Sequence, residues 1–333
     1  MKNKVFLFVF LFFALLVSAY AIYVYIESKN DNTVLTPVSV RLKWLHQAQF
    51  AGNYVAEQKN YYKEEGLDVE LKAYDYKNDP IEEVVSGKSD FGITGAENII
   101  VARNQGKKVK ALAVVYQDSP AVAFSLKSSG ILELKDFVGK RLGVSKDLEA
   151  VIMTMLKSSG IGSAEVKIMR TDFGIDPLIK NEVDVGTGYV TNEVIQLEEN
   201  GQEVEVFAPY KFGVKMYADV LFTTEEMIAK NPGIVAGFVK ATLRGWEYAL
   251  SHVDEAVKLT LLYKDDNNKA LNYDHQKALL DKSVPFIKPN INRKVGEMNY
   301  VDWKRTNQLL VDSGVVQNKL EVSHMYTTEF ISP

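Results

Sequence analysis

The chain has 333 residues, of which 47% are hydrophobic and 25% are charged, and its formal net charge is -4. These values predict two lobes of ordinary domain size and exclude a disordered protein, while the scattered basic residues argue against nucleic acid as a partner. With no cysteine and four separated histidines, the sequence excludes thiol chemistry and predicts neither a metal site nor a cofactor.

The first 26 residues predict a targeting segment. Lys2 and Lys4 precede an apolar run over residues 5–17, and residues 19–21 read Ala-Tyr-Ala, a pattern of signal-peptide cleavage. Apolar character continues to residue 26, so the segment also approaches the roughly 20 residues that span a bilayer. A cleaved signal and an uncleaved membrane anchor both remain open. Either one places the folded part outside the cytoplasmic membrane, periplasmic or at the cell surface, with residues 27–37 as a polar linker.

From residue 38 onward, short β-rich runs alternate with amphipathic stretches, which predicts an α/β fold with parallel sheets covered on both faces. A helix is expected over residues 53–65, ending at Gly66. Asp79 and Pro80 predict the N-cap and first-turn proline of a second helix. Buried strands are expected at residues 38–42, 69–74, 91–93 and 109–116.

An internal repeat at an offset of about 94 residues links this part of the chain to the next. Each copy reads as a helix, an Asp-x-Gly strand, a turn and another helix. The matched positions are Ile81, Val84, Val85, Asp90, Gly92 and Asn98 in one copy, and Ile175, Leu178, Ile179, Asp184, Gly186 and Asn192 in the other. Two lobes of the same construction would meet at a cleft, with a ligand beyond the strand ends.

The chain is expected to cross between lobes near residues 121–126 and 218–223, which predicts a hinge. Lobe 1 then comprises residues 38–123 and 220–333, and lobe 2 comprises residues 124–219. After the return, Asn231 and Pro232 predict the start of a long helix whose apolar stripe, including Trp246, faces the core.

The turn after the first expected strand is rich in rings and amides. A strand-to-helix turn exposes side chains to a cleft, so Trp44 could stack on a ring while His46 and Gln49 hydrogen-bond its edge. Alternatively, Trp44 and Phe50 anchor the core and His46 is a solvated loop residue. The candidate ligand-binding residues in this turn are Trp44, His46, Gln49, Phe50 and Tyr54.

The matching turn of the second lobe contains Tyr189, Asn192 and Glu193, which supply a ring, an amide and a carboxylate. The alternative is structural: Thr191 would be an N-cap, and Glu193 an early helical residue favoured by the helix dipole.

Three further residues are candidates for ligand contact, namely Glu97, Asp118 and Ser145. Phosphate-binding glycine loops and the G-x-S-x-G elbow are absent from the sequence, so binding is favoured over catalysis.

Residues 44–54 and 61–69 resemble the opening of ABC-importer substrate-binding proteins of the thiamine-pyrimidine type. That group includes binders of formylaminopyrimidine and, more distantly, of sulfonates, nitrate and riboflavin-like compounds. Similar segments also occur at residues 86–92, 219–227, 243–249 and 325–330.

This resemblance implies a two-lobed periplasmic-binding-protein fold of type II, with the ligand cleft between lobes joined by two hinge crossings. It places Trp44 and Tyr189 near an aromatic ligand and Glu193 on the ligand's exocyclic amine. Relatives often have a proline and an asparagine after the tryptophan, where this chain has Leu45 and His46, so the exact pyrimidine stays open. The same family shape includes a eukaryotic pyrimidine synthase, whose cysteine-rich motif is missing here.

The predicted function is therefore capture of a small pyrimidine-like ligand for an ABC permease and its ATPase, without catalysis. A membrane-tethered ligand-sensing module of a signalling system is the alternative. A monomer is expected because no apolar surface helix is left over to require a partner.

Overall fold

The computed structural model describes Ser18 and residues 34–331, apart from positions 76, 172–173, 264–267, 269 and 291. The expected export segment, except Ser18, and the linker up to residue 33 lie outside the described residues. The chain divides into two compact units, Met1–Thr36 and Pro37–Pro333. Everything below concerns the second unit.

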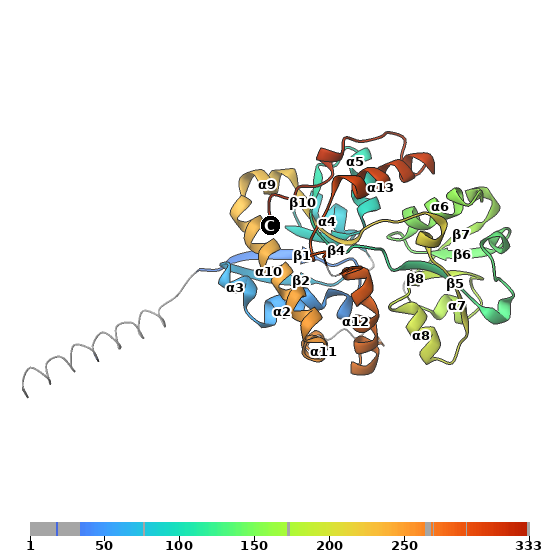
Figure 1. Cartoon of the computed structure of the whole chain (residues 1–333), viewed down its shortest axis with the longest axis horizontal. Helices are drawn as coiled ribbons and strands as arrows, with labels where there is room; N and C mark the ends of the chain where they lie inside the picture. The colour runs from blue at the N-terminus through green and yellow to red at the C-terminus, as the bar shows by residue number, and fades with distance from the viewer. Residues whose placement is uncertain are drawn as a thin grey trace, which may run out of the picture. The chain divides into compact units, whose positions relative to one another are not determined.

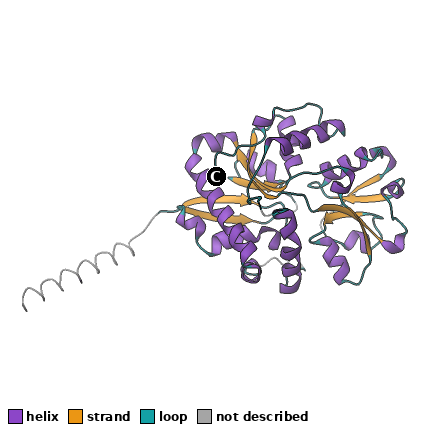
Figure 2. Ribbon diagram, in the orientation of Figure 1, coloured by secondary structure: helices purple, strands orange, loops and turns teal. Residues whose placement is uncertain are grey.

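The first lobe is built on a five-stranded mixed sheet with the order β2-β1-β3-β10-β4 (Figures 1 and 2). Its strands are β1 (Thr36–Arg41), β2 (Leu67–Lys72), β3 (Phe91–Thr94), β4 (Val109–Tyr116) and β10 (Ala218–Thr224). β1 runs parallel to β3, whereas β10 runs antiparallel to both of its neighbours. β10, the last of these strands in the sequence, therefore lies between two strands that come much earlier in the chain.

Helices cover the sheet of the first lobe. They are α2 (Ala51–Gln58), α3 (Tyr61–Glu64), α4 (Pro80–Val85), α5 (Ala96–Asn104), α9 (Glu225–Lys230), α10 (Pro232–Ser251), α11 (Val253–Thr260), α12 (Tyr273–Ile287) and α13 (Tyr300–Asp312). The stripe predicted for the helix after Asn231 is confirmed, because Val235, Phe238 and Trp246 of α10 are buried in the core. Trp246 is thus a packing residue.

The second lobe repeats this plan. Its strands are β5 (Ala121–Leu126), β6 (Arg141–Val144), β7 (Lys167–Arg170), β8 (Gly186–Tyr189) and β9 (Val204–Phe207). β8, β5 and β9 form one sheet, β6 and β7 pair separately, and a parallel bridge from Leu142 to Val185 joins β6 to the start of β8. The helices are α6 (Glu149–Ser158), α7 (Asp176–Ile179) and α8 (Glu193–Glu199).

The strand order across the second lobe is therefore β7-β6-β8-β5-β9, which matches β2-β1-β3-β10-β4 position by position. In both lobes the fourth strand runs antiparallel and follows directly on a crossing between lobes. The chain crosses between β4 and β5 and returns between β9 and β10. Short 3-10 helices complete the fold: η1 (Ala48–Phe50), η2 (Lys127–Ser129), η3 (Leu134–Phe137), η4 (Ser163–Glu165), η5 (Pro209–Phe212) and η6 (Val322–His324).

The α/β class is confirmed, but two local expectations are wrong. The helix expected over residues 53–65 is divided into α2 and α3, because Asn60 adopts a left-handed backbone with φ 60° that ends the first helix. The sheets are mixed rather than parallel, since both crossing strands run antiparallel. The helix start at Asp79 and Pro80 is confirmed: Asp79 Oδ1 accepts a hydrogen bond from the Ile81 amide at 2.8 Å.

Candidate functional site

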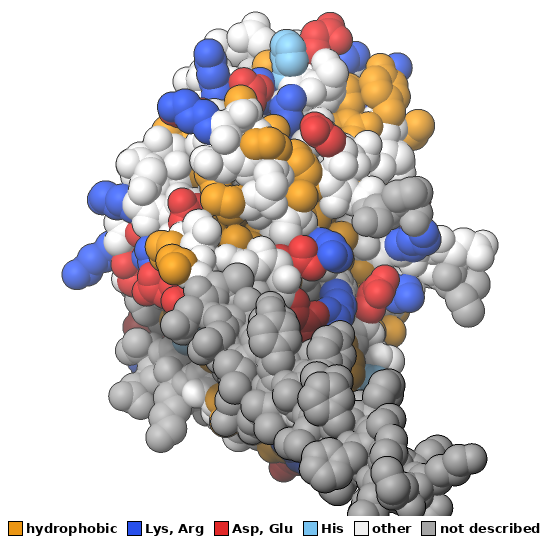
Figure 3. All heavy atoms as spheres, turned by 90° about the vertical axis from the view of Figure 1, so that its left-hand side faces the viewer, with side chains coloured by type: hydrophobic (Ala, Val, Ile, Leu, Met, Phe, Trp, Pro, Cys, Tyr) orange, Lys and Arg blue, Asp and Glu red, His pale blue; other side chains and the backbone are white. Residues whose placement is uncertain are grey.

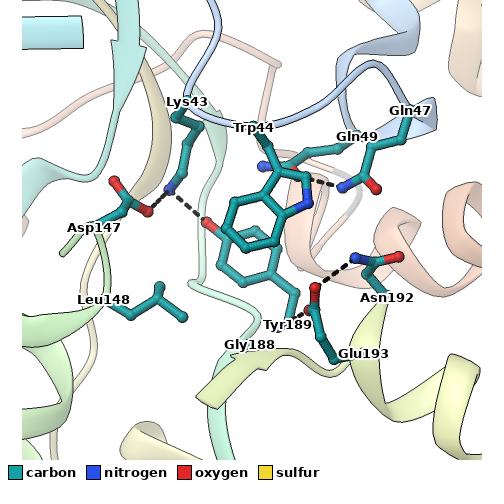
Figure 4. Close-up of a pocket in the computed structure, with 10 residues that line it drawn as sticks. All are labelled: Lys43, Trp44, Gln47, Gln49, Asp147, Leu148, Gly188, Tyr189, Asn192 and Glu193. Carbon is teal, nitrogen blue, oxygen red and sulfur yellow. Dashed lines mark hydrogen bonds and ion pairs between the residues drawn. The ribbon is translucent and has the colours of Figure 1, made fainter. Parts of the chain in front are cut away.

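A pocket lies between the two lobes (Figure 4). The turn after β1 forms its wall on the first lobe, and the end of β8, the start of α8 and the turn before α6 form its wall on the second. The lining residues are Lys43, Trp44, Gln47, Gln49, Asp147, Leu148, Gly188, Tyr189, Asn192 and Glu193. The pocket encloses about 10 Å³, room for about one water molecule. Side chains of both lobes thus nearly fill the space between them.

Lys43 is the central charge of this pocket and is 3% exposed. Its Nζ lies 2.8 Å from Asp147 Oδ2, donates to Tyr189 Oη at 2.8 Å and lies 3.6 Å from Asp219 Oδ1. Burial alone would lower the pKa of the Lys43 ammonium, but the Asp147 and Asp219 carboxylates raise it above its ordinary value. Lys43 therefore stays charged and connects the first lobe to Asp147 and Tyr189 of the second.

Asp219 collects hydrogen bonds from both lobes. Its carboxylate accepts from Tyr189 Oη at 3.1 Å and from Gln49 Nε2 at 2.8 Å, and Gln47 Nε2 donates in turn to Gln49 Oε1 at 2.7 Å. Burial raises the pKa of Asp219, while the Lys43 ammonium opposes the rise. Asp219 has φ 47°, an uncommon backbone conformation for a residue with a side chain, found more often at functional sites.

Glu193 opens α8 and is 1% exposed. Its Oε2 accepts from the Tyr189 amide at 2.7 Å, and its Oε1 accepts from Asn192 Nδ2 at 2.7 Å. Burial raises the pKa of Glu193 to about 7, although these hydrogen bonds favour the ionised form and oppose the rise. The carboxylate contacts Gly188 so closely that a Cβ at this glycine would lie 2.5 Å from Oε2.

A histidine contact between the lobes lies beside this carboxylate. His275 of α12 is buried, with Nε2 3.0 Å from Asn192 Oδ1 and Nδ1 2.8 Å from Glu199 Oε2. Asn192 and Glu199 flank the two ends of α8. Because Asn192 also donates to Glu193, the contact positions the amide that fixes the Glu193 carboxylate.

The structure brings five of the candidate residues to this pocket, and Figure 4 shows them from both lobes. They are Trp44, Gln49, Tyr189, Asn192 and Glu193. Asn192, rather than Thr191, occupies the N-cap position of α8, with no hydrogen bond from its side chain to the helix backbone.

Three candidates in the first turn lie away from the pocket. Phe50 and Tyr54 are buried in the core of the first lobe. His46 Nδ1 lies 3.0 Å from Tyr54 Oη, and its ring lies 5.4 Å from that of Tyr263. Burial supports the packing alternative for Phe50, and Tyr54 lies in the same core.

Three further candidates do not line the pocket. Glu97, at the start of α5, is 5% exposed, and burial raises its pKa to about 7 while the Lys43 charge opposes the rise. Ser145 follows β6 and is buried, and its hydroxyl has no hydrogen-bond partner among the described residues. Asp118 lies in the first crossing, where its amide donates to the Phe286 carbonyl at 3.1 Å.

The polar residues that sequence reasoning missed are Lys43, Gln47, Asp147 and Asp219. A signal was present for two of them: Lys43 directly precedes Trp44, and Asp219 begins a segment that carries the family resemblance. Buried lysine is rare, however, and its partners come from distant parts of the chain, so the pairing could be recognised only in the folded structure.

The described residues contain no cluster of three or more His, Asp or Glu side chains that could hold a metal ion. Among the same residues, no helix combines the length and apolar character needed to cross a bilayer.

Three relatives of known name are similar over most of the chain. The riboflavin-binding protein RibY of Chloroflexus aurantiacus is 27% identical, over 91% of this chain and 88% of its own. The 4-amino-5-hydroxymethyl-2-methylpyrimidine phosphate synthase of Legionella pneumophila is 25% identical, over 88% and 92%. The formylaminopyrimidine-binding protein of Halalkalibacterium halodurans is 27% identical, over 84% and 86%.

Solved structures share the fold. The periplasmic aliphatic sulphonate binding protein SsuA of Escherichia coli has a TM-score of 0.67 at 13% identity, covering 89% of this chain and 94% of its own. A Candida albicans protein described as having the generic periplasmic binding protein fold also has a TM-score of 0.67, at 18% identity, covering 88% and 97%. These similarities confirm the two-lobed periplasmic-binding-protein fold. The model of the family described as NMT1/THI5 like matches residues 47–256, and the chain belongs to that family.

Proposed function

We propose that this protein is the extracytoplasmic solute-binding protein of an ABC importer, and that it captures a small flat nitrogen heterocycle for the permease and its ATPase. One observation carries the proposal: Trp44 of the first lobe and Tyr189 and Glu193 of the second line the same pocket. A site built from two lobes binds its ligand fully only when the lobes are together.

In this proposal, the rings of Trp44 and Tyr189 stack on the ligand, and Glu193 accepts a hydrogen bond from its amine. Gln49 and Asn192 are the amides at the ligand's edge. The names of two relatives, a riboflavin-binding and a formylaminopyrimidine-binding protein, support a flat nitrogen-containing ring.

Ligand entry requires the lobes to separate, since about 10 Å³ cannot hold a heterocycle. We place the hinge in the crossings near residues 121–126 and 218–223, with lobe 1 comprising residues 38–123 and 220–333 and lobe 2 comprising residues 124–219. Opening would break the contacts of Lys43 with Asp147 and Tyr189.

Non-catalytic binding is proposed even though one relative is named as a synthase. The resemblance places a cysteine-rich motif in the eukaryotic synthase, and this chain has no cysteine. The alternative of a membrane-tethered sensing module shares the same pocket, and neighbouring genes distinguish the two: permease and ATPase genes favour import, whereas a signalling enzyme favours sensing.

The remaining parts of the proposal concern location and assembly. The first 26 residues would export the chain, as a cleaved signal or as an anchor, and the folded part would act as a monomer. On the face shown in Figure 3, basic and acidic side chains are interspersed over the visible described surface. Such a surface suits a small-molecule binding protein better than a nucleic-acid-binding one.

A thermal-shift screen over pyrimidines, flavins, alkanesulfonates and nitrate tests the proposal, with calorimetry on each hit. We expect a pyrimidine or flavin to raise the unfolding temperature in wild type and to do so much less in Trp44→Ala. Stabilisation by alkanesulfonates or nitrate alone would reject the heterocycle. Release of a chemically altered ligand after incubation would reject non-catalytic binding.

A further inference from the structure

The pocket wall contains a cation, Lys43, whose charge is already balanced by carboxylates. Of the described residues that line the pocket, Lys43 alone is basic. Its Nζ contacts the Asp147 carboxylate at 2.8 Å, and the Asp219 carboxylate lies 3.6 Å away. A ligand anion would have to compete with two carboxylates for one ammonium group, so Lys43 provides no surplus positive charge.

Several hydrogen-bond donors of the wall are directed at other side chains of the wall. Lys43 donates to Asp147, Gln49 donates to Asp219, Gln47 donates to Gln49, and Asn192 Nδ2 donates to Glu193. Because an ionised carboxylate can only accept, Asp219 fixes the direction of the amide chain that ends at Gln47.

The wall also offers hydrogen-bond acceptors to a ligand. Glu193 Oε2 accepts from the Tyr189 amide and Oε1 accepts from Asn192, and a carboxylate, with about four lone-pair sites, can accept further hydrogen bonds. Gln47 Nε2 donates to Gln49, and the side-chain carbonyl oxygen of Gln47 is a further acceptor. These acceptors suit a ligand that donates N–H groups.

We infer that Lys43, Asp147 and Asp219 make the pocket selective for uncharged or cationic ligands that donate N–H hydrogen bonds, and that ligands carrying phosphate, sulfonate or carboxylate groups are rejected. This inference rests on the function proposed above and narrows its ligand class. A like charge placed beside desolvated carboxylates is strongly unfavourable, so we expect at least about 100-fold weaker binding of an anionic derivative.

Matched ligands test the inference on the wild-type protein by calorimetry. The probes are 4-amino-5-hydroxymethyl-2-methylpyrimidine with its phosphate ester and its acetyl ester, and riboflavin with riboflavin 5′-phosphate. The acetyl ester adds bulk without charge. We expect the uncharged ring to bind at least about 100-fold more tightly than its phosphate ester, with the acetyl ester close to the parent.

Two results overturn the inference while leaving the proposed function intact: a phosphate ester that binds within tenfold of its parent, or an acetyl ester as weak as the phosphate. If an alkanesulfonate binds and none of the pyrimidines or flavins does, both this inference and the proposed function are overturned.

A charge-removing variant locates the selectivity. Asp147→Asn removes one carboxylate at almost constant size, and we expect it to reduce the preference for the uncharged ring by about tenfold. Glu203→Gln makes the same change of net charge at a site whose side chain is 81% exposed, and it should keep the wild-type preference. An unchanged preference in Asp147→Asn rejects the role assigned to the Lys43 and Asp147 pair. Circular dichroism on each variant checks that it is folded.

Discussion

Glu193 lies between two fixed donors, the Tyr189 amide and the Asn192 side chain, so its carboxylate is held in one position. If a ligand amine donates to it, the charge-assisted hydrogen bond is worth about 1.5 to 3 kcal/mol. We expect Glu193→Gln to weaken an amine-bearing ligand by about 10- to 100-fold, measured by calorimetry. Trp44→Ala should weaken flat ligands with and without an amine alike. If Glu193→Gln binds the ligand with wild-type affinity, Glu193 is only a carboxylate at the start of a helix and the proposed contact with the ligand amine is rejected.

The same carboxylate predicts a pH dependence of binding. Because burial raises the pKa of Glu193 to about 7, the group gains its full charge only above neutral pH. Affinity for a neutral amine-bearing ligand should therefore rise between pH 6 and pH 8, as the ionised acceptor becomes populated.

Burial also raises the pKa of Glu97 to about 7, against the charge of Lys43, so Glu97 could contribute to such a profile. Calorimetry across this range on Glu193→Gln and Glu97→Gln separates the two groups. A flat wild-type profile, or a rise that persists in Glu193→Gln, contradicts the assignment.

At the scale of secondary-structure elements, the repeat has a structural cause. Asp90 accepts from the Ser39 amide in β1 at 2.8 Å, and Asp184 accepts from the Arg141 amide in β6 at 2.8 Å. In each lobe, the aspartate before the central strand thus binds the neighbouring parallel strand.

The glycine of each Asp-x-Gly lies under an aromatic ring of the crossing strand. A Cβ at Gly92 would lie 2.5 Å from Phe222, and one at Gly186 would lie 2.6 Å from Phe124. The motif therefore marks how a crossing strand packs, rather than a ligand contact.

Local signals explain which features could be predicted from the sequence. The helix start at Asp79 and the strand-end positions of Trp44 and Tyr189 follow from neighbouring residues, because capping and turn chemistry are local. The left-handed Asn60 and the antiparallel crossing strands depend on packing between distant segments. Lys43 was missed for the same reason: a lysine becomes a buried site residue only when separate lobes supply its acids.

Gly188 provides a prediction for the strand that supports Glu193. A Cβ here would lie 2.5 Å from Oε2 and 2.7 Å from Cδ of a carboxylate that two donors hold in place. We expect Gly188→Ala to displace Glu193, to lower the unfolding temperature and to weaken an amine-bearing ligand at least as much as Glu193→Gln does.

Gly233→Ala in α10 is the matched control, because nothing lies within 4 Å of its added Cβ. Its unfolding temperature should be unchanged or raised, since alanine favours a helix by about 0.5 to 1 kcal/mol over glycine. Scanning calorimetry compares the two variants, and equal behaviour would contradict the packing argument.

At the scale of the whole molecule, closure depends on several contacts between lobes. Asn98 of α5 donates to Asp147 Oδ1 at 3.1 Å, and Lys146 Nζ lies 3.0 Å from Asp79 Oδ2. Lys43 pairs with Asp147 and Tyr189, and His275 contacts Asn192 and Glu199. We expect a tight ligand to reduce the radius of gyration in small-angle scattering, because its contacts are completed only with the lobes together. Superimposable scattering curves with and without a saturating ligand would reject the hinge.

The fourth strand of each sheet also bears on the origin of the fold. β5 leaves the first half of the chain to complete the second sheet, and β10 leaves the second half to complete the first. Two identical halves that exchanged one strand would make this arrangement as a homodimer, and gene duplication with fusion would then give a single chain. Such an ancestry explains why the halves share a strand order, and why neither half contains every strand of its own sheet.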